Sequence, residues 1–216
     1  MNLTKEQVRR RICETAIIPV VRASTPDLAL ATARAICAGG IPVVEITMTV
    51  PCAIDVIAEL TRQNAMLVGA GTVLDAATAR RCIEAGAEFL VSPVLDSATV
   101  NLAKDEGKLM MAGGLTPVEV VDAWNSGADF VKVFPCNTMG GAAYIKTLRT
   151  VFPHIEMVPT GGVNLANTDA FLAAGAAAVG VGGEMISSAA LHAGDFASIE
   201  ESARRFADLA RGVREI

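Results

Sequence analysis

The sequence predicts an α/β protein that folds as a (β/α)8 barrel, a TIM barrel with an N-terminal helix. Apolar segments of strand length alternate with alanine-rich segments of helical length, and eight such units fit into the 216 residues. Aromatic residues make up only 4% of the chain, so the core must be built from Ala, Val, Ile and Leu, as in layered α/β proteins. No linker or low-complexity segment interrupts the pattern, and residues 1–216 are therefore expected to form one domain.

The elements are expected in a regular order. Residues 4–14 should form an amphipathic helix, because Thr4 can cap its N-terminus and Glu6 places an acidic group in its first turn. A last helix, at about residues 196–211, carries its charges on one side. The eight strands between them are predicted at residues 16–22, 43–48, 66–72, 89–93, 109–114, 129–135, 156–162 and 177–183.

Helix boundaries between the strands are marked by residues that favour helix starts and helix ends. The start signals are Asp27, Pro51, Asp75, Asp96 and Pro117, and the end signals are Gly39, Gly40, Gly86, Gly107, Gly127 and Gly175. An open doubly wound sheet is the alternative fold. Such a sheet normally carries a glycine-rich fingerprint after its first strand, where this chain has Arg22-Ala23-Ser24.

Charge and composition argue against several classes of partner. A net charge of −5 disfavours general nucleic-acid binding, although a locally positive site can still bind a small anion. No apolar run is long enough to span a bilayer and no signal-peptide pattern is present, so no membrane partner is expected. Five cysteines without a CxxC pair are typical of reduced thiols in a cytoplasmic protein. The two histidines, His154 and His192, lie away from the strand ends, so a surface position and no metal site are expected.

The apolar segment at residues 129–135 contains a lysine, Lys132, at its centre. Alternation along a strand places Lys132 on one face with two phenylalanines, Phe130 and Phe134, and two valines on the other face. Because burial disfavours an ammonium group, a lysine inside a barrel gives up its proton more readily and becomes a nucleophilic amine. The alternative is an edge-strand lysine whose side chain reaches solvent.

Further polar residues lie at the ends of predicted strands, where a barrel carries its catalytic residues. Arg22 ends the first strand and Glu45 lies in the second, and alternation directs both into the same mouth as Lys132. Glu45 stands in an apolar segment, which indicates a general acid/base; the alternative is a stabilising ion pair with Arg22 or Lys132. Thr72 ends the third strand, after a flexible glycine-containing stretch at 69–71.

Glycine pairs follow the last two strands. Gly161 and Gly162 come after the seventh strand, and Gly182 and Gly183 after the eighth. Backbone amides in these loops, together with a helix N-terminus, can bind an anion such as phosphate. One glycine pair could be only a tight turn, but two pairs in the loops that hold phosphate in many barrels indicate an anion site.

Five short motifs carry a resemblance to a known family. They are VEIT at 44–47, VGAGT at 68–72, VSP at 91–93, KVFP at 132–135 and PTGGV at 159–163. In this order, over essentially the whole chain, they resemble the 2-dehydro-3-deoxy-phosphogluconate (KDPG) aldolases, also called bifunctional 4-hydroxy-2-oxoglutarate (KHG)/KDPG aldolases. The resemblance implies a class I aldolase on a TIM barrel, without metal or other cofactor and commonly homotrimeric.

The resemblance also implies roles for individual residues. Lys132 would form the Schiff base with a 2-keto acid substrate, and Glu45 would be the general acid/base. Thr72 and Pro93 would line the pyruvyl end of the substrate. The residues expected to bind substrate are Arg22, Thr49, Thr72, Pro93, Phe134, Thr160, Gly161, Gly162, Gly182 and Gly183.

The chain departs from the family pattern at three places. Thr49 stands where many relatives have an arginine for the substrate carboxylate, and we therefore assign this role to Arg22, whose guanidinium suits a carboxylate. Gly183, followed by Glu184, replaces a serine that is often used for phosphate. Residues 112–114 read Ala-Gly-Gly in place of the commoner Pro-Gly.

The predicted activity is cleavage of a 2-keto-3-deoxy sugar acid. KDPG, which gives pyruvate and glyceraldehyde 3-phosphate, is the leading substrate, and KHG, which gives pyruvate and glyoxylate, is a second one. One alternative is a 2-dehydro-3-deoxy-6-phosphogalactonate aldolase, which has the same lysine chemistry with another configuration at C4. Others are a phosphate-binding barrel isomerase or epimerase that forms no imine, and a sugar-acid-binding barrel without activity.

Overall fold

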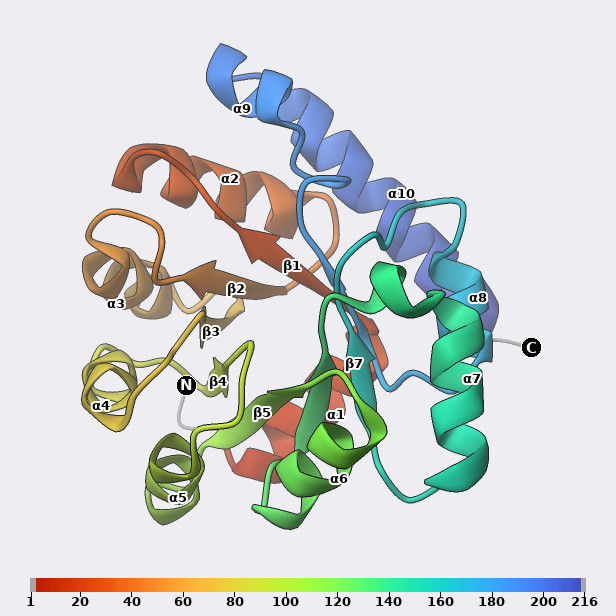
Figure 1. The fold of residues 1–216 in the computed structure, drawn as a ribbon. Helices are drawn as coiled ribbons and strands as arrows, with labels where there is room; N and C mark the ends of the chain where they lie inside the picture. Colours follow the sequence, from red (N-terminus) through yellow and green to blue (C-terminus); the bar gives the residue numbers. More distant parts are fainter. Residues whose placement is uncertain (1–2, 215–216) are drawn as a thin grey trace.

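Eight parallel strands alternate with helices around a barrel in the computed structural model, which describes residues 3–214 (Figure 1). The strands pair in the order β7-β6-β5-β4-β3-β2-β1-β8. The seam between β7 and β8 is joined by a parallel bridge between Thr160 and Gly180 and by a hydrogen bond of 2.9 Å from the Ala177 N–H to the Met157 carbonyl. The predicted (β/α)8 barrel is therefore confirmed.

The strands follow each other in the predicted order, whereas the short helix α9 before the last helix was not predicted. The strands are β1 Ile17–Val21, β2 Val43–Thr47, β3 Leu67–Gly71, β4 Phe89–Val91, β5 Leu109–Gly114, β6 Phe130–Val133, β7 Met157–Pro159 and β8 Val179–Val181. The helices are α1 Lys5–Thr15, α2 Pro26–Ala38, α3 Ala53–Gln63, α4 Ala76–Glu84, α5 Ser97–Asp105, α6 Pro117–Asn125, the 3-10 turn η1 Cys136–Met139, α7 Ala142–Val151, α8 Thr168–Ala173, α9 Ser188–Ala193 and α10 Phe196–Arg214.

Most predicted helix boundaries are confirmed. Thr4 caps α1 in a reciprocal capping box with Gln7, and Asp75 and Asp96 cap α4 and α5 through their side chains. Glycines end helices as expected, because they adopt the left-handed conformation just after the last turn; Gly86, for example, has φ +98°. None of the helices in residues 3–214 is long and apolar enough to cross a membrane.

Seven of the eight predicted strands extend one to three residues too far at their C-terminal ends. The strand predicted at residues 156–162 ends at Pro159, because Gly161 and Gly162 have φ values of +97° and +74° and leave the extended conformation. The strand predicted at residues 129–135 ends at Val133. The shorter strands place the polar residues and glycines of these segments in loops above the barrel.

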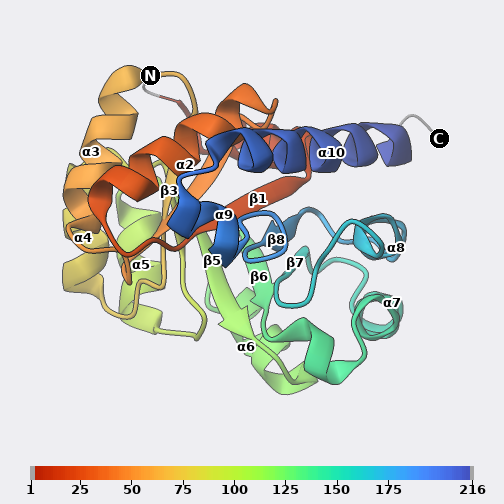
Figure 2. The same cartoon turned by 90° about the horizontal axis from the view of Figure 1, so that it is seen from above.

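Side chains alternate between two apolar layers. One cluster fills the barrel interior, and a second fills the space between the strands and the surrounding helices. On β6, Phe130 belongs to the interior cluster and Val131 and Val133 to the outer one, as predicted. Figure 2 shows α2 and α10 side by side over β1, where they bury part of the outer layer.

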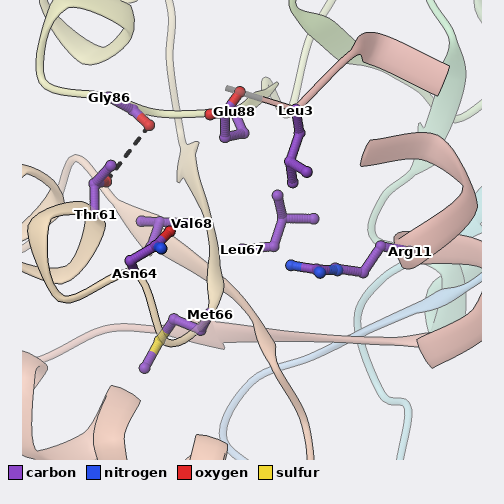
Figure 3. A pocket seen from close by; sticks show the side chains of 9 residues that line it. All are labelled: Leu3, Arg11, Thr61, Asn64, Met66, Leu67, Val68, Gly86 and Glu88. Atoms are coloured by element: carbon purple, nitrogen blue, oxygen red, sulfur yellow. Dashed lines mark hydrogen bonds between the residues drawn. The ribbon is translucent and has the colours of Figure 1, made fainter. Parts of the chain in front are cut away.

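Helix α1 closes the N-terminal end of the barrel. Val8 and Ile12 join the interior cluster, and Lys5 forms an ion pair of 2.8 Å with Asp129 next to the start of β6. A small pocket nearby encloses only about 20 Å³, about the space of one water molecule, between residues such as Leu3 (Figure 3). A molecule larger than water does not fit into this pocket.

Candidate active site

Lys132 and Glu45 face each other inside the barrel. Lys132 comes from β6 and Glu45 from β2. The Lys132 Nζ atom lies 3.7 Å from the Glu45 Oε1 atom. The two side chains are only 4% and 3% exposed. Since β6 is paired on both sides, by β5 and β7, the alternative of an edge-strand lysine that reaches solvent is wrong.

One oxygen of the Glu45 carboxylate has no hydrogen-bond partner among residues 3–214. This Oε1 atom is buried, and within residues 3–214 it accepts no hydrogen bond; the Lys132 ammonium lies beyond hydrogen-bond distance. Leaving a buried acceptor without a hydrogen bond costs free energy. The Glu45 Oε1 atom can therefore accept a hydrogen bond from a substrate hydroxyl or a water molecule. The contact with Lys132 fits both the catalytic and the ion-pair interpretation of Glu45.

Glycines on β3 make room for this arrangement. A Cβ atom added to Gly71 would collide with the Glu45 carboxylate, and one added to Gly69 would collide with the ring of Phe89. Both glycines are buried in regular strand. The prediction that residues 69–71 are flexible is therefore wrong: these positions provide space for side chains of the neighbouring strands.

Replacing Gly71 by alanine should destabilise the protein by about 1–3 kcal/mol, because the added methyl group overpacks a closed site. Urea unfolding followed by circular dichroism measures this change. Gly183→Ala is the matched control, since its added Cβ meets nothing within 4 Å, and it should change stability by less than about 0.5 kcal/mol. An equal effect of both variants would contradict the packing role of Gly71.

The two predicted glycine pairs border one cavity of about 230 Å³. It lies above the ends of β7, β8 and β1, and its lining includes both pairs and the side chains Val20, Arg22, Phe134, Thr160, Val163 and Glu184. A helix N-terminus was also expected here. The structure differs, because α8 begins only at Thr168, and the amides available to an anion are those of the loops.

Arg22 projects into this cavity from the end of β1. Its side chain is exposed, and its Nη1 atom lies 3.8 Å from the position that a Cβ of Gly182 would occupy. Arg22 and Thr49 also border a neighbouring hollow of about 240 Å³. The Thr49 hydroxyl is 2.6 Å from that of Thr47, which is buried and lies 3.1 Å from the Val21 carbonyl. The strand ends β1 and β2 are thereby fixed side by side.

Phe134 separates the first cavity from a larger one of about 520 Å³. The Lys132 Nζ lies 5.6 Å from the centre of the Phe134 ring, a distance at which the ring attracts a cation. Pro93 lines the larger cavity, and a Cβ on Gly113 would collide with the Pro93 backbone. Gly113 therefore lets the loop after β4 approach β5 closely, and Gly114 gives the same room to the backbone of α6 at Glu119.

Thr72 is placed differently from the other predicted substrate residues. It borders none of these three cavities. Its φ of +57° is unusual for a β-branched residue, and the left-handed conformation turns the chain sharply after β3.

Four residues that line the first cavity were not among the predicted substrate-binding residues: Val20, Val163, Gly180 and Glu184. Val20 lies two residues before Arg22 and therefore shares its face, so its position could have been derived from strand parity. Gly180 was not derivable in this way. A Cβ there would collide with the Thr160 hydroxyl, so the glycine lets the last strand approach β7 closely.

Cys136 and the two histidines were not predicted to act on the substrate, although His192 borders the hollow of about 240 Å³ next to Arg22 and Thr49. Cys136 is buried directly after Pro135, and burial raises the pKa of its thiol to about 11, so it is a poor nucleophile at neutral pH. His154 and His192 are exposed, as predicted. Within residues 3–214, no cluster of three or more His, Cys, Asp or Glu side chains could hold a metal ion.

Comparison with known proteins identifies the family. Residues 8–202 match the family model described as KDPG and KHG aldolase. The chain is 33% identical over 200 residues to a 2-dehydro-3-deoxy-phosphogluconate aldolase of Pseudomonas aeruginosa, covering 90% of this chain and 91% of the relative. It is 32% identical over 190 residues to the KHG/KDPG aldolase of Escherichia coli, covering 87% and 89%.

Solved structures agree with the sequence comparison. A KDPG aldolase from Legionella pneumophila, with pyruvate captured as a covalent carbinolamine, superposes with a TM-score of 0.84 at 28% identity over 92% of this chain and 97% of its own. A native KDPGal structure gives the same TM-score and identity, over 93% and 96%. A 3-hexulose-6-phosphate synthase, at 18% identity and a TM-score of 0.68, shares the fold alone. The chain therefore belongs to the KDPG and KHG aldolase family.

Proposed function

We propose that this protein is a class I aldolase that cleaves a 2-keto-3-deoxy sugar acid. The main reaction is cleavage of KDPG to pyruvate and glyceraldehyde 3-phosphate, with cleavage of KHG to pyruvate and glyoxylate as a second activity. The observation that carries the proposal is the pair formed by Lys132 and Glu45, both buried and 3.7 Å apart inside the barrel. Relatives named for these two reactions are 32–33% identical to the chain.

Burial gives Lys132 the property that this chemistry requires. Two opposite charges in a dry site are costly, and imine formation uses the uncharged form of the Lys132 amine. The neutral amine is then the nucleophile. Arginine could not take this role, because its guanidinium does not lose its proton in proteins.

The reaction proceeds through a covalent imine. The Lys132 amine adds to the C2 ketone and forms a carbinolamine, whose hydroxyl takes up a proton and leaves as water, so that an iminium ion remains. The electrons of the C3–C4 bond flow into the iminium ion as that bond breaks, while Glu45 takes the proton of the C4 hydroxyl. The aldehyde leaves, C3 of the enamine is protonated, and hydrolysis releases pyruvate and the free lysine. The carbinolamine of the Legionella relative corresponds to the first covalent species.

The surrounding residues orient the substrate. Arg22, exposed and without an ion-pair partner within residues 3–214, is free to bind the C1 carboxylate. Thr160 and the amides of the two glycine loops hold the tail, and Phe134 covers the reacting amine. Pro93 lines the pyruvyl end, and Thr49 borders the same hollow as Arg22. No metal or cofactor takes part in these steps.

A comparison of substrates tests the proposal. We expect purified protein to release pyruvate from KDPG faster than from KHG or from the galactonate epimer, measured by coupled oxidation of NADH with lactate dehydrogenase. Faster release from the epimer would favour the alternative, a 2-dehydro-3-deoxy-6-phosphogalactonate aldolase. The similarity of this chain to the KDPGal structure supports that alternative. Absence of pyruvate from all three substrates would overturn the proposal.

We also propose a homotrimer in the cytoplasm. One structure similar to this chain, with a TM-score of 0.83 at 27% identity over 92% of this chain and 73% of its own, is a protein cage designed by fusing symmetric oligomeric domains. Light scattering after gel filtration should give three times the mass of one chain. A monomer mass across a range of concentrations would contradict the trimer and leave the aldolase proposal untouched.

A further inference from the structure

The cavity above β7, β8 and β1 contains a negative charge. Among its lining residues, Arg22 and Glu184 are the two charged side chains, and they come from the ends of β1 and β8. Within residues 3–214 neither forms an ion pair, with the other or with any third group. The formal charge of the cavity is therefore zero, although its glycine loops offer amides to an anion.

The loop that carries Glu184 is fixed on both sides. The N–H groups of Met185 and Ile186 both donate to the Gly182 carbonyl, at 3.0 Å each. The side chains of Met185 and Ile186 are buried, with exposures of 2% and 6%. The backbone at position 184 is thus held at the border of the cavity, while the carboxylate itself is exposed to solvent.

A phosphorylated tail and a hydroxyl tail meet this carboxylate differently. Phosphate carries almost two negative charges at neutral pH, so a carboxylate bordering the same small cavity repels it; in a solvent-exposed site this amounts to a factor of about three to ten in affinity. A hydroxyl group instead can donate a hydrogen bond to the carboxylate. Once Arg22 binds the substrate carboxylate, no second cationic side chain in the cavity lining offsets Glu184.

We infer that Glu184 is a specificity-determining residue, which reduces the preference of this aldolase for phosphorylated over non-phosphorylated 2-keto-3-deoxy acids. The inference rests on the proposed function, because it concerns the tail of the same substrate. Glu184 touches neither the bond that breaks nor the amine that attacks. It acts on the binding of the tail, and a neutral side chain at this position strengthens binding of phosphate.

The selectivity of Glu184→Gln tests the inference. The quantity to measure is the ratio of kcat/KM for KDPG to kcat/KM for 2-keto-3-deoxygluconate, the same acid without phosphate. We expect the ratio to rise about three- to ten-fold in the variant, and the difference from the unmodified protein to shrink at about 0.5 M salt, where charges are screened. Glu84→Gln is the matched control: Glu84 is also exposed, it lies at the end of α4, and its loss changes the net charge equally.

A second measurement is independent of turnover. Inorganic phosphate should bind Glu184→Gln more tightly than the unmodified protein by a similar factor in calorimetry, with Glu84→Gln unchanged. If pyruvate is released but the substrate ratio and phosphate affinity do not change, the inference fails and the proposed function stands. If no substrate is cleaved while phosphate affinity rises in Glu184→Gln, the proposed function fails and the charge effect stands. A lower ratio in Glu184→Gln would overturn the inference directly.

Discussion

Replacing Lys132 by alanine should reduce cleavage of KDPG by about 10⁴-fold or more, because the variant has no amine that can form the imine. Lys132 is the only one of the five lysines that is buried in the barrel; the other four, all in the described part of the chain, are Lys5, Lys104, Lys108 and Lys146. None of them can take its place. Pyruvate release measures the loss.

Covalent trapping identifies the same residue chemically. Borohydride added with pyruvate should reduce the imine and leave a stable adduct on Lys132, located by peptide mass spectrometry. Lys146→Ala removes an exposed lysine of α7 and serves as the control, with activity and adduct retained. An adduct on another lysine, or an unmodified Lys132 in active protein, would reject the mechanism.

Two further variants of Lys132 distinguish loss of the reacting amine from loss of the folded structure. Lys132→Met retains most of the volume of the side chain and should be as inactive as the alanine variant. Lys132→Arg retains the positive charge opposite Glu45 but cannot form an imine, and it should also be inactive. Circular dichroism checks that each variant is folded. Activity in Lys132→Arg would mean that the charge, and not the amine, is what the reaction needs.

The fold was predictable because its signals are local. Alternation within β6 separates Phe130 from Val131, and this same parity directs Lys132 inward. Helix caps such as Thr4 and Asp75 depend on residues only three positions away. The end of β7 was predicted too late, because a glycine pair in the sequence does not show that Gly161 and Gly162 adopt positive φ values.

The residue types of the site were predictable from the sequence, but the distances between their side chains were not. An acid and a lysine within apolar segments are predicted to be buried. Their distance is not predictable in this way, because β2 and β6 lie four strands apart and only the closed barrel brings Glu45 to 3.7 Å from Lys132. The space that Gly71 leaves for Glu45 depends on a neighbouring strand and has no local signature. The same holds for Glu184, which the sequence places after β8 without saying that it borders the cavity.

Glu45→Gln should slow turnover of KDPG by about 10²–10⁴-fold and leave the imine with pyruvate still detectable. Glutamine has nearly the same shape, so it fits against Gly71, but its amide cannot accept the C4 hydroxyl proton. Cleavage therefore fails at the C3–C4 bond, while addition of Lys132 to the ketone continues at a lower rate. Single-turnover cleavage and the yield of borohydride adduct measure the two steps separately.

The same variant decides between the two interpretations of Glu45. If Glu45 only pairs with Lys132, its replacement removes one partner of a buried ion pair, and stability should fall by about 3–5 kcal/mol without a specific block at bond cleavage. If Glu45 is the acid/base, cleavage falls far more than adduct formation, and the loss remains under conditions where the variant is fully folded. Urea unfolding of the variant, read beside its two rates, therefore identifies the role, and a destabilised protein with an unchanged cleavage rate would leave Glu45 with a structural role alone.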